Sequence, residues 1–245
     1  MLKNLGALKV GVTMIVTTLA LTTTNAMAAA PEINTRDLVP NVALKPTTYH
    51  IAYEDKTSCV GRYNGRTYNG NERSEILNPD GDIIAVVCSR YYARLAMEGT
   101  GVLSAANGSH TVNWKANWRF IILNKCTYGR GEEEKCLIPF HTIAANNTIY
   151  PVGTILYIPD VVKRKVTLPN GELHNGYFVV RDTGGAFQSA GPERVDLFVA
   201  GQEDSDNIFI NKSIHYPKTY PSFLVIDESR ENVEKYFKAK YPSLW

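Results

Sequence analysis

Six short runs of β-branched and aromatic residues, separated by turn-forming residues, restrict this chain to a mostly β architecture. The runs span residues 47–53, 111–123, 154–159, 176–180, 194–200 and 221–226. Pro-Asn-Gly at 169–171 and His-Asn-Gly at 174–176 separate the third run from the fourth, because these residues favour tight turns. Six strands in one chain predict a small barrel.

Two further segments predict helices. Between residues 82 and 99, apolar residues recur at helical spacing, with Asp82 as a candidate N-cap and Gly99 as a candidate C-cap. A second helical pattern covers residues 228–241, near the end of the chain. The expected fold is therefore mostly β, with a helical segment inserted at about 80–100 and a C-terminal helix.

The first residues have the pattern of a cleaved secretory signal. Lys3 and Lys9 precede an apolar run at 10–21, and Ala26-Met27-Ala28 supplies the small residues that a signal peptidase accepts. Threonines interrupt the run, which is shorter than the roughly 18 apolar residues of a membrane span. We expect a signal peptide at 1–28, a flexible leader at 29–44 and one domain at 45–245. The protein would be periplasmic or secreted, without stable membrane insertion.

The charge balance excludes one class of partner. Removal of residues 1–28 takes away two lysines and no acidic residue, which leaves 24 basic and 24 acidic residues. A nucleic-acid partner would favour a basic surface, so none is expected. The five histidines show no ligand spacing, and we expect neither a metal nor a cofactor.

The four cysteines of an exported chain predict two disulfides. The sequence leaves three connectivities open. The polar segment between Cys126 and Cys136 reads as a hairpin loop that would bring its ends together, which favours that pair and leaves Cys59 with Cys88.

Two aspartates follow or interrupt apolar runs. Asp182 precedes Thr-Gly-Gly at 183–185, and such a motif is often an ordinary turn with a locally bonded carboxylate. Asp196 lies among apolar residues, where a charge without a role costs stability. An aspartic peptidase needs two Asp-Thr-Gly aspartates sharing one proton, whereas this chain has a single such motif, so that reading is a minor alternative.

Longer segments carry a more specific similarity. CLIPFHTIAANNTIYPVGTILYIP at 136–159 and GYFVVRDTGGAFQSAGPERVDLFVAG at 176–201 resemble the 3D (three-aspartate) domain of the lytic murein transglycosylase A family. TTYHIAYE at 47–54 and YYARLAMEGTGVL at 91–103 resemble upstream segments of the same family. The resemblance extends from about Lys45 to about Ile226.

The resemblance implies a double-psi β-barrel and an enzyme that cleaves the β-1,4 bond between N-acetylmuramic acid and N-acetylglucosamine, forming a 1,6-anhydro product. Its substrate and partner would be peptidoglycan glycan strands. Asp196 falls on the catalytic aspartate, a single acid and base, and Asp182 would lie beside it. The remaining residues that the resemblance places at the groove are Thr48, Thr183, Gly184, Gly185 and Asn146.

Two departures from the family pattern leave an alternative open. Asn146 stands where the family has its first aspartate, and an amide cannot titrate. The segment from Asp182 to Asp196 is also about three residues longer than usual, so a surface loop absorbs the extra length or Asp196 moves. A non-catalytic module that binds cell-wall glycan is therefore the alternative function. The oligomeric state stays open.

Overall fold

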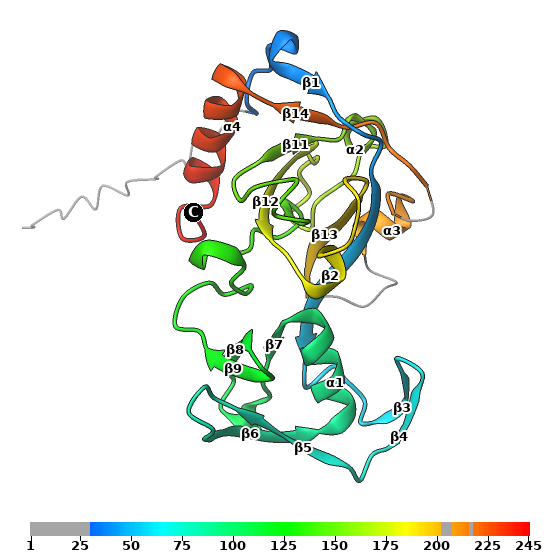
Figure 1. The fold of residues 1–245 in the computed structure, drawn as a ribbon, viewed down its shortest axis with the longest axis vertical. Coiled ribbons are helices and arrows are strands. Elements are labelled where there is room, and N and C mark those ends of the chain that lie inside the picture. Colours follow the sequence, from blue (N-terminus) through cyan, green and yellow to red (C-terminus); the bar gives the residue numbers. More distant parts are fainter. Residues whose placement is uncertain (1–29, 202–206, 216–217) are drawn as a thin grey trace, which may run out of the picture.

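The computed structural model describes residues 30–201, 207–215 and 218–245. The expected signal peptide lies outside these residues. Figure 1 shows a larger lobe, which contains both ends of the described chain, and a smaller lobe below it. Strand β2 (Lys45–Tyr53) runs from the larger lobe to the smaller one and belongs to the main sheet of the molecule.

That sheet has ten strands in the order β1-β14-β11-β12-β10-β13-β2-β7-β8-β9. The bounds of the other nine are β1 (Leu38–Pro40), β7 (Thr100–Val102), β8 (Thr111–Ala116), β9 (Arg119–Ile122), β10 (Thr142–Ala144), β11 (Ile155–Tyr157), β12 (Tyr177–Asp182), β13 (Arg194–Gly201) and β14 (Phe223–Val225). Three neighbouring pairs are parallel: β10 with β12, β13 with β2, and β2 with β7. The mostly β prediction is confirmed. The strand order is open at both ends, so a double-psi barrel stays a prediction.

The larger lobe is built around strands that are buried along most of their length. In β12, the first five residues are all buried, as expected for a strand covered on both faces. The main apolar cluster of the larger lobe includes Leu44, Ile143, Phe178, Val180 and Leu197. The short helices α2 (Pro159–Lys163) and α3 (Ile208–Asn211) add Val161 and Phe209 to the same cluster. This packing holds β10, β12 and β13 in a fixed register.

The smaller lobe contains more strands than the sequence predicts, since only an inserted helix was expected in this segment. It contains two hairpins, β3 (Val60–Tyr63) with β4 (Arg66–Asn69) and β5 (Arg73–Leu77) with β6 (Ile83–Cys88), followed by α1 (Ser89–Glu98). The helix therefore begins at Ser89, and the residues from Ile83 to Cys88 form a strand. Isoleucines and valines dominate this stretch and favour an extended backbone that pairs with β5. Gly99 ends the helix with a left-handed conformation, as expected.

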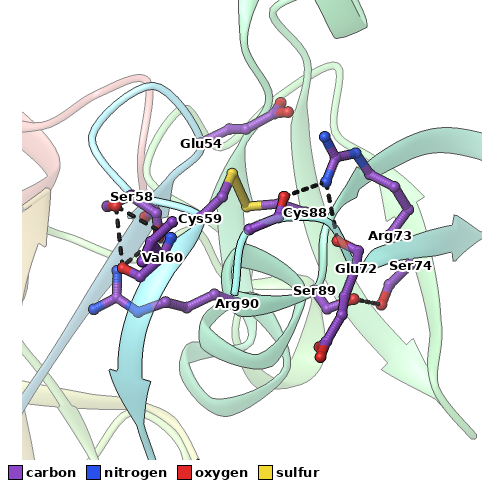
Figure 2. The surroundings of a disulfide bond; sticks show 12 residues. Glu54, Ser58, Cys59, Val60, Glu72, Arg73, Ser74, Cys88, Ser89 and Arg90 are labelled. Carbon is purple, nitrogen blue, oxygen red and sulfur yellow. Dashed lines mark hydrogen bonds between the residues drawn. A yellow bond between two sulfur atoms is a disulfide. The ribbon is translucent and has the colours of Figure 1, made fainter. Parts of the chain in front are cut away.

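Both predicted disulfides are confirmed, Cys59 with Cys88 and Cys126 with Cys136. Figure 2 shows the first of these, which joins the entry of β3 to the start of α1. Around it, Arg90 Nη1 donates to the Ser58 carbonyl at 2.7 Å, and the hydroxyls of Ser74 and Ser89 lie 2.9 Å apart. The Cys59–Cys88 disulfide thus connects both hairpins of the smaller lobe to the helix α1.

The segment expected as a flexible leader is partly ordered. Residues 35–37 form the 3-10 helix η1, and β1 pairs with β14 in an antiparallel arrangement. The Asp37 carboxylate accepts a hydrogen bond from the Ser229 amide in the first turn of α4 (Asp227–Lys240) at 3.0 Å. Leu38 also packs against an apolar cluster that includes Val233 and Phe237 of α4, which adds to this anchoring. Among the residues that the structure describes, no helix combines the length and apolar character needed to cross a bilayer.

Candidate active site

Four residues from four adjacent strands form one row across the sheet. Asp182 on β12 pairs with Ala144 on β10, Ala144 pairs with Asp196 on β13, and Asp196 pairs with Thr47 on β2. Neighbouring strands lie about 4.8 Å apart, so the Cα atoms of the two aspartates are separated by about 10 Å. The residue between them is alanine, whose small side chain leaves space for both carboxyl groups. The two predicted aspartates are therefore neighbours across β10.

A bulge in β12 sets this alignment. Val180 pairs with Ile143 and Asp182 pairs with Ala144, so Arg181 is an extra residue on the β12 side. Bulges bend a strand and redirect its side chains, and they are common beside active sites. Here the bulge brings Asp182 opposite Ala144 and sends the Arg181 side chain towards Leu244, the residue before Trp245, whose carbonyl accepts a hydrogen bond from it.

Asp196 is partly buried and bonded to β2. The Thr47 hydroxyl donates a hydrogen bond to Asp196 Oδ1. Burial raises the pKa of Asp196 to about 6, and the nearby Arg194 guanidinium partly opposes this rise. Half of these carboxyl groups would hold a proton at a pH near 6.

Asp182 is a still weaker acid. Burial raises its pKa to about 7, while the neighbouring Tyr49 hydroxyl and a hydrogen bond from the Thr183 amide lower it. The Thr183 amide donates to Asp182 Oδ1 at 2.9 Å. The charge of Asp196 also contributes to the raised pKa of Asp182. The two carboxyl groups thus interact electrostatically.

The hydroxyl of Tyr49 lies close to Asp182 and was not among the predicted site residues. Burial raises the pKa of Tyr49 well above its usual value, followed by the charges of Asp182, Asp196 and Glu98. The hydroxyl oxygen is buried and forms no hydrogen bond of regular geometry. Its position two residues after Thr47 on β2 is the available sequence signal, since alternate residues of a strand share a face.

The carboxylate of Glu98 extends this polar row into the smaller lobe. Glu98 ends α1, and its Oε2 accepts a hydrogen bond from the His50 amide at 3.1 Å. The His50 ring lies 3.5 Å from Glu98 Oε1 and 3.1 Å from Arg94 Nη2. Residues of α1 therefore contact β2 directly beside Tyr49.

Among the predicted groove residues, Thr48 is displaced from the position expected for it. The threonine bonded to Asp196 is Thr47, which pairs with Asp196, whereas Thr48 pairs with Leu197. Successive side chains of a strand point to opposite faces, so a shift of one residue changes the face. The structure therefore places Thr47, and not Thr48, at the Asp196 carboxyl group.

The side chain of Asn146 makes hydrogen bonds within its own loop and to the loop that precedes β13. Its Oδ1 accepts from the Thr148 amide at 3.0 Å and from the Thr148 hydroxyl at 2.8 Å. Its Nδ2 donates to the Ala190 carbonyl at 3.2 Å. The amide thus holds two loops together, a role that needs a donor and an acceptor on one side chain.

The loop between Asp182 and β13 is held by hydrogen bonds to neighbouring segments. Thr183 donates its hydroxyl to the Ala145 carbonyl at 2.8 Å. A Cβ atom on Gly184 would contact only the Phe187 ring, and one on Gly185 would meet nothing within 4 Å. Tyr150 donates to the Pro192 carbonyl at 2.8 Å, which fixes the loop before β13 begins. Asp196 therefore keeps its alignment with Asp182.

The chemistry available to this site is proton transfer. Two carboxyl groups that titrate at about 6 and about 7 can each donate a proton near neutral pH. Within the described part of the chain, no three His, Cys, Asp or Glu side chains come together as metal ligands would.

Comparison with known proteins connects this site to a family. Residues 141–212 match the family model of the 3D domain. Among curated proteins, no sequence matches the chain.

Solved structures of lytic transglycosylases are similar to the chain at low identity. A membrane-bound lytic murein transglycosylase from Agrobacterium tumefaciens is 11% identical, with a TM-score of 0.46 over 78% of this chain and 75% of that one. MltA from E. coli with bound chitohexaose is 13% identical, with a TM-score of 0.44 over 75% of this chain and 71% of that one. LtgG of Burkholderia pseudomallei is 13% identical, with a TM-score of 0.40 over 75% and 71%. The match to the family model covers Asn146, Asp182 and Asp196, and the segment that carries all three is a 3D domain.

Proposed function

We propose that this protein is a lytic transglycosylase that cleaves the β-1,4 bond between N-acetylmuramic acid and N-acetylglucosamine in peptidoglycan. The observation that carries the proposal is the row Asp182, Ala144, Asp196 and Thr47, in which Asp196 has a pKa raised to about 6. The 3D domain at residues 141–212 supports the same reading. The double-psi barrel and export by a cleaved signal at 1–28 are parts of this proposal.

In the proposed reaction, protonated Asp196 donates its proton to the glycosidic oxygen as the bond from C1 of the muramic acid breaks. The resulting carboxylate then takes the proton of the C6 hydroxyl of the same sugar while O6 bonds to C1. The product is a 1,6-anhydro ring, and no water is consumed. One carboxyl group suffices because the nucleophile belongs to the substrate, whereas ordinary glycosidases use two. Intramolecular attack also removes the cost of bringing in a separate nucleophile.

Several neighbours have supporting roles in this proposal. Asp182 would stay largely protonated below a pH of about 7 and hold a hydrogen bond to substrate or to Tyr49. The open space over Gly185 suits the close approach of a sugar to the backbone at 183–185. In this proposal Thr48 and Asn146 would also contact the glycan. They would do so through atoms that are not used in the pairing of β2 or in the hydrogen bonds of the Asn146 side chain.

The test is digestion of purified sacculi, with the products separated and identified by mass spectrometry. The protein lacking residues 1–28 should release muropeptides that end in 1,6-anhydro-muramic acid. Asp196→Asn should lower their release by roughly a thousandfold, because general acid catalysis contributes about that much. Asp80→Asn, the same change on an exposed turn of the smaller lobe, is the matched control and should leave release unchanged.

Other outcomes distinguish the alternatives. Binding to sacculi without any product would favour the non-catalytic wall-binding module, which the substitution of an amide at Asn146 supports. Products with ordinary reducing ends would identify a hydrolase. Unchanged anhydro-product release by Asp196→Asn would remove Asp196 from its proposed role.

A further inference from the structure

A cavity separate from the aspartate row lies between β12, the turn η3 (Glu132–Glu134) and helix α4. Its volume is about 280 Å³. Its charged lining residues are Glu133, Lys135, Arg181, Arg230, Glu234 and Lys238. Figure 1 shows the end of α4 above the η3 region, on the side of the larger lobe that faces away from β2. The size is close to the lower end of small-molecule sites, at about 300 Å³.

The deepest charged group of this cavity is the guanidinium of Arg181, which has no acidic partner. The side chain is only 3% exposed. Both of its hydrogen bonds start from Nη1, one to the Cys136 carbonyl and one to the Leu244 carbonyl, each at 2.7 Å. Among the described residues, Nε and Nη2 have no hydrogen-bond acceptor and no carboxylate lies within ion-pair distance. Burial lowers the pKa of Arg181 to about 10, so the group is still charged at neutral pH.

A buried charge without a counter-charge is costly, and neighbouring cations add to the cost. The side chains that line the cavity include four cations and two carboxylates. Arg230 pairs with Glu234 at 3.2 Å, whereas Lys135 and Lys238 have no ion pair among the described residues. The cavity therefore has a positive potential that an anion would offset.

An aromatic wall gives the cavity a second kind of surface. The Trp245 ring lies over the Arg181 guanidinium, with 4.2 Å between the guanidinium carbon and the ring centroid. The same ring stacks on Phe237 with centroids 5.9 Å apart and planes inclined by 14°. Lys238 Nζ lies 5.8 Å from the Trp245 centroid. The indole is thus held in place by packing and presents a fixed apolar edge to a ligand.

We propose that this cavity binds a small ligand whose carboxylate or phosphate group lies against Arg181, Arg230 and Lys238 while its remaining atoms contact Trp245. Arginine suits this role because its planar fork matches both kinds of anion. The proposal does not rest on the reaction assigned to Asp196.

The experiment is isothermal titration calorimetry of the protein lacking residues 1–28, in a buffer free of carboxylates and phosphate. Inorganic phosphate and succinate are the two probes. At least one should bind saturably with one site per chain, and the preferred probe identifies the anion. Arg230→Gln and Lys238→Gln remove exposed cations and should each weaken binding by about tenfold, as expected for the loss of one charge-assisted bond. Lys115→Gln, an exposed lysine of the smaller lobe, should bind as the wild type does.

Asp196→Asn provides an independent control, because it should bind the probe normally if the cavity is the site. Loss of binding in that variant would move the anion to the aspartate row and overturn the proposal. The absence of saturable binding for both probes would overturn it too, as would equal affinity of the wild type, Arg230→Gln and Lys238→Gln. None of these outcomes depends on transglycosylase activity.

Discussion

The Thr47 hydroxyl donates to the carboxyl group that we propose as the general acid. A hydroxyl that donates to a carboxylate stabilises the charged form, so we expect loss of this contact to raise the pKa of Asp196. Thr48, one residue later, pairs with Leu197 and lacks this contact. The two adjacent threonines therefore differ in their contact with Asp196.

The pair supplies a prediction with its own control. Thr47→Val should raise the pKa of Asp196, and the pH at which kcat/KM falls to half its maximum should move above about 6. Thr48→Val, an equivalent change on the neighbouring residue, should leave that pH in place. Measurement of kcat/KM on soluble glycan strands between pH 4 and 9 would check both. Equal pH profiles for the two variants would show that the Thr47 hydroxyl does not influence the acid.

At the scale of elements, the buried side-chain amide of Asn113 links the disulfide loop that contains Arg130 to β7 and β8. Asn113 on β8 is 6% exposed. Its Oδ1 accepts from the Arg130 amide at 2.9 Å and from the Thr100 hydroxyl at 2.7 Å. Its Nδ2 donates to the Arg130 carbonyl at 2.9 Å. Arg130 lies inside the loop closed by the Cys126–Cys136 disulfide, so Asn113 joins that loop to β7 and β8.

Asn113→Ala should lower the free energy of unfolding by about 3 kcal/mol, because it leaves a buried amide and a buried hydroxyl without partners. Urea-induced unfolding followed by circular dichroism would measure the change. Asn124→Ala, on an exposed position just before the disulfide loop, should have little effect. If Asn113→Ala lowers the free energy of unfolding only slightly, water replaces the amide and the loop is held chiefly by its disulfide.

At the scale of the whole molecule, two pairs of buried titratable groups affect stability in opposite directions. Burial raises the folded pKa values of Asp182 and Asp196 to about 7 and about 6, from a usual value near 3.8. Their contribution to stability is greatest at low pH and is lost as pH rises through these values. Burial lowers the pKa of His141 to about 4 and that of His174 well below its usual value. Their contribution is present above about 6.5 and is lost as pH falls towards 4.

Between pH 4 and 6.5 the two effects oppose each other, so the wild type should show a shallow dependence of Tm on pH. Asp182→Asn combined with Asp196→Asn removes the acidic pair and leaves the histidines. The Tm of this double variant should fall more steeply than that of the wild type as pH falls from 6.5 to 4. Differential scanning calorimetry across this range would measure both slopes. Parallel curves would show that the aspartates keep ordinary pKa values in the folded protein.

Local patterns in the sequence identified about half of the strands, both disulfides and the two aspartates, although the run at 111–123 forms two strands, β8 and β9. Periodicity and turn residues act over short distances, which is why β2, β12, β13 and α4 were foreseen close to their actual bounds. Prediction failed where pairing with another strand decided the outcome. The residues from Ile83 to Cys88 form a strand because β5 lies beside them, and residues 38–40 are ordered because β14 does.

The geometry of the candidate site depended on tertiary structure. Asp182 and Asp196 are on different strands, and their alignment across Ala144 follows from a bulge at Arg181 that no local pattern reveals. The choice of Thr47 over Thr48 is a matter of register between parallel strands far apart in the chain. The sequence alone identified the two carboxyl groups of the candidate site, because the identity of a side chain does not depend on the rest of the fold. Only the packed sheet decided which of them share one surface, because burial and strand pairing are properties of the whole chain.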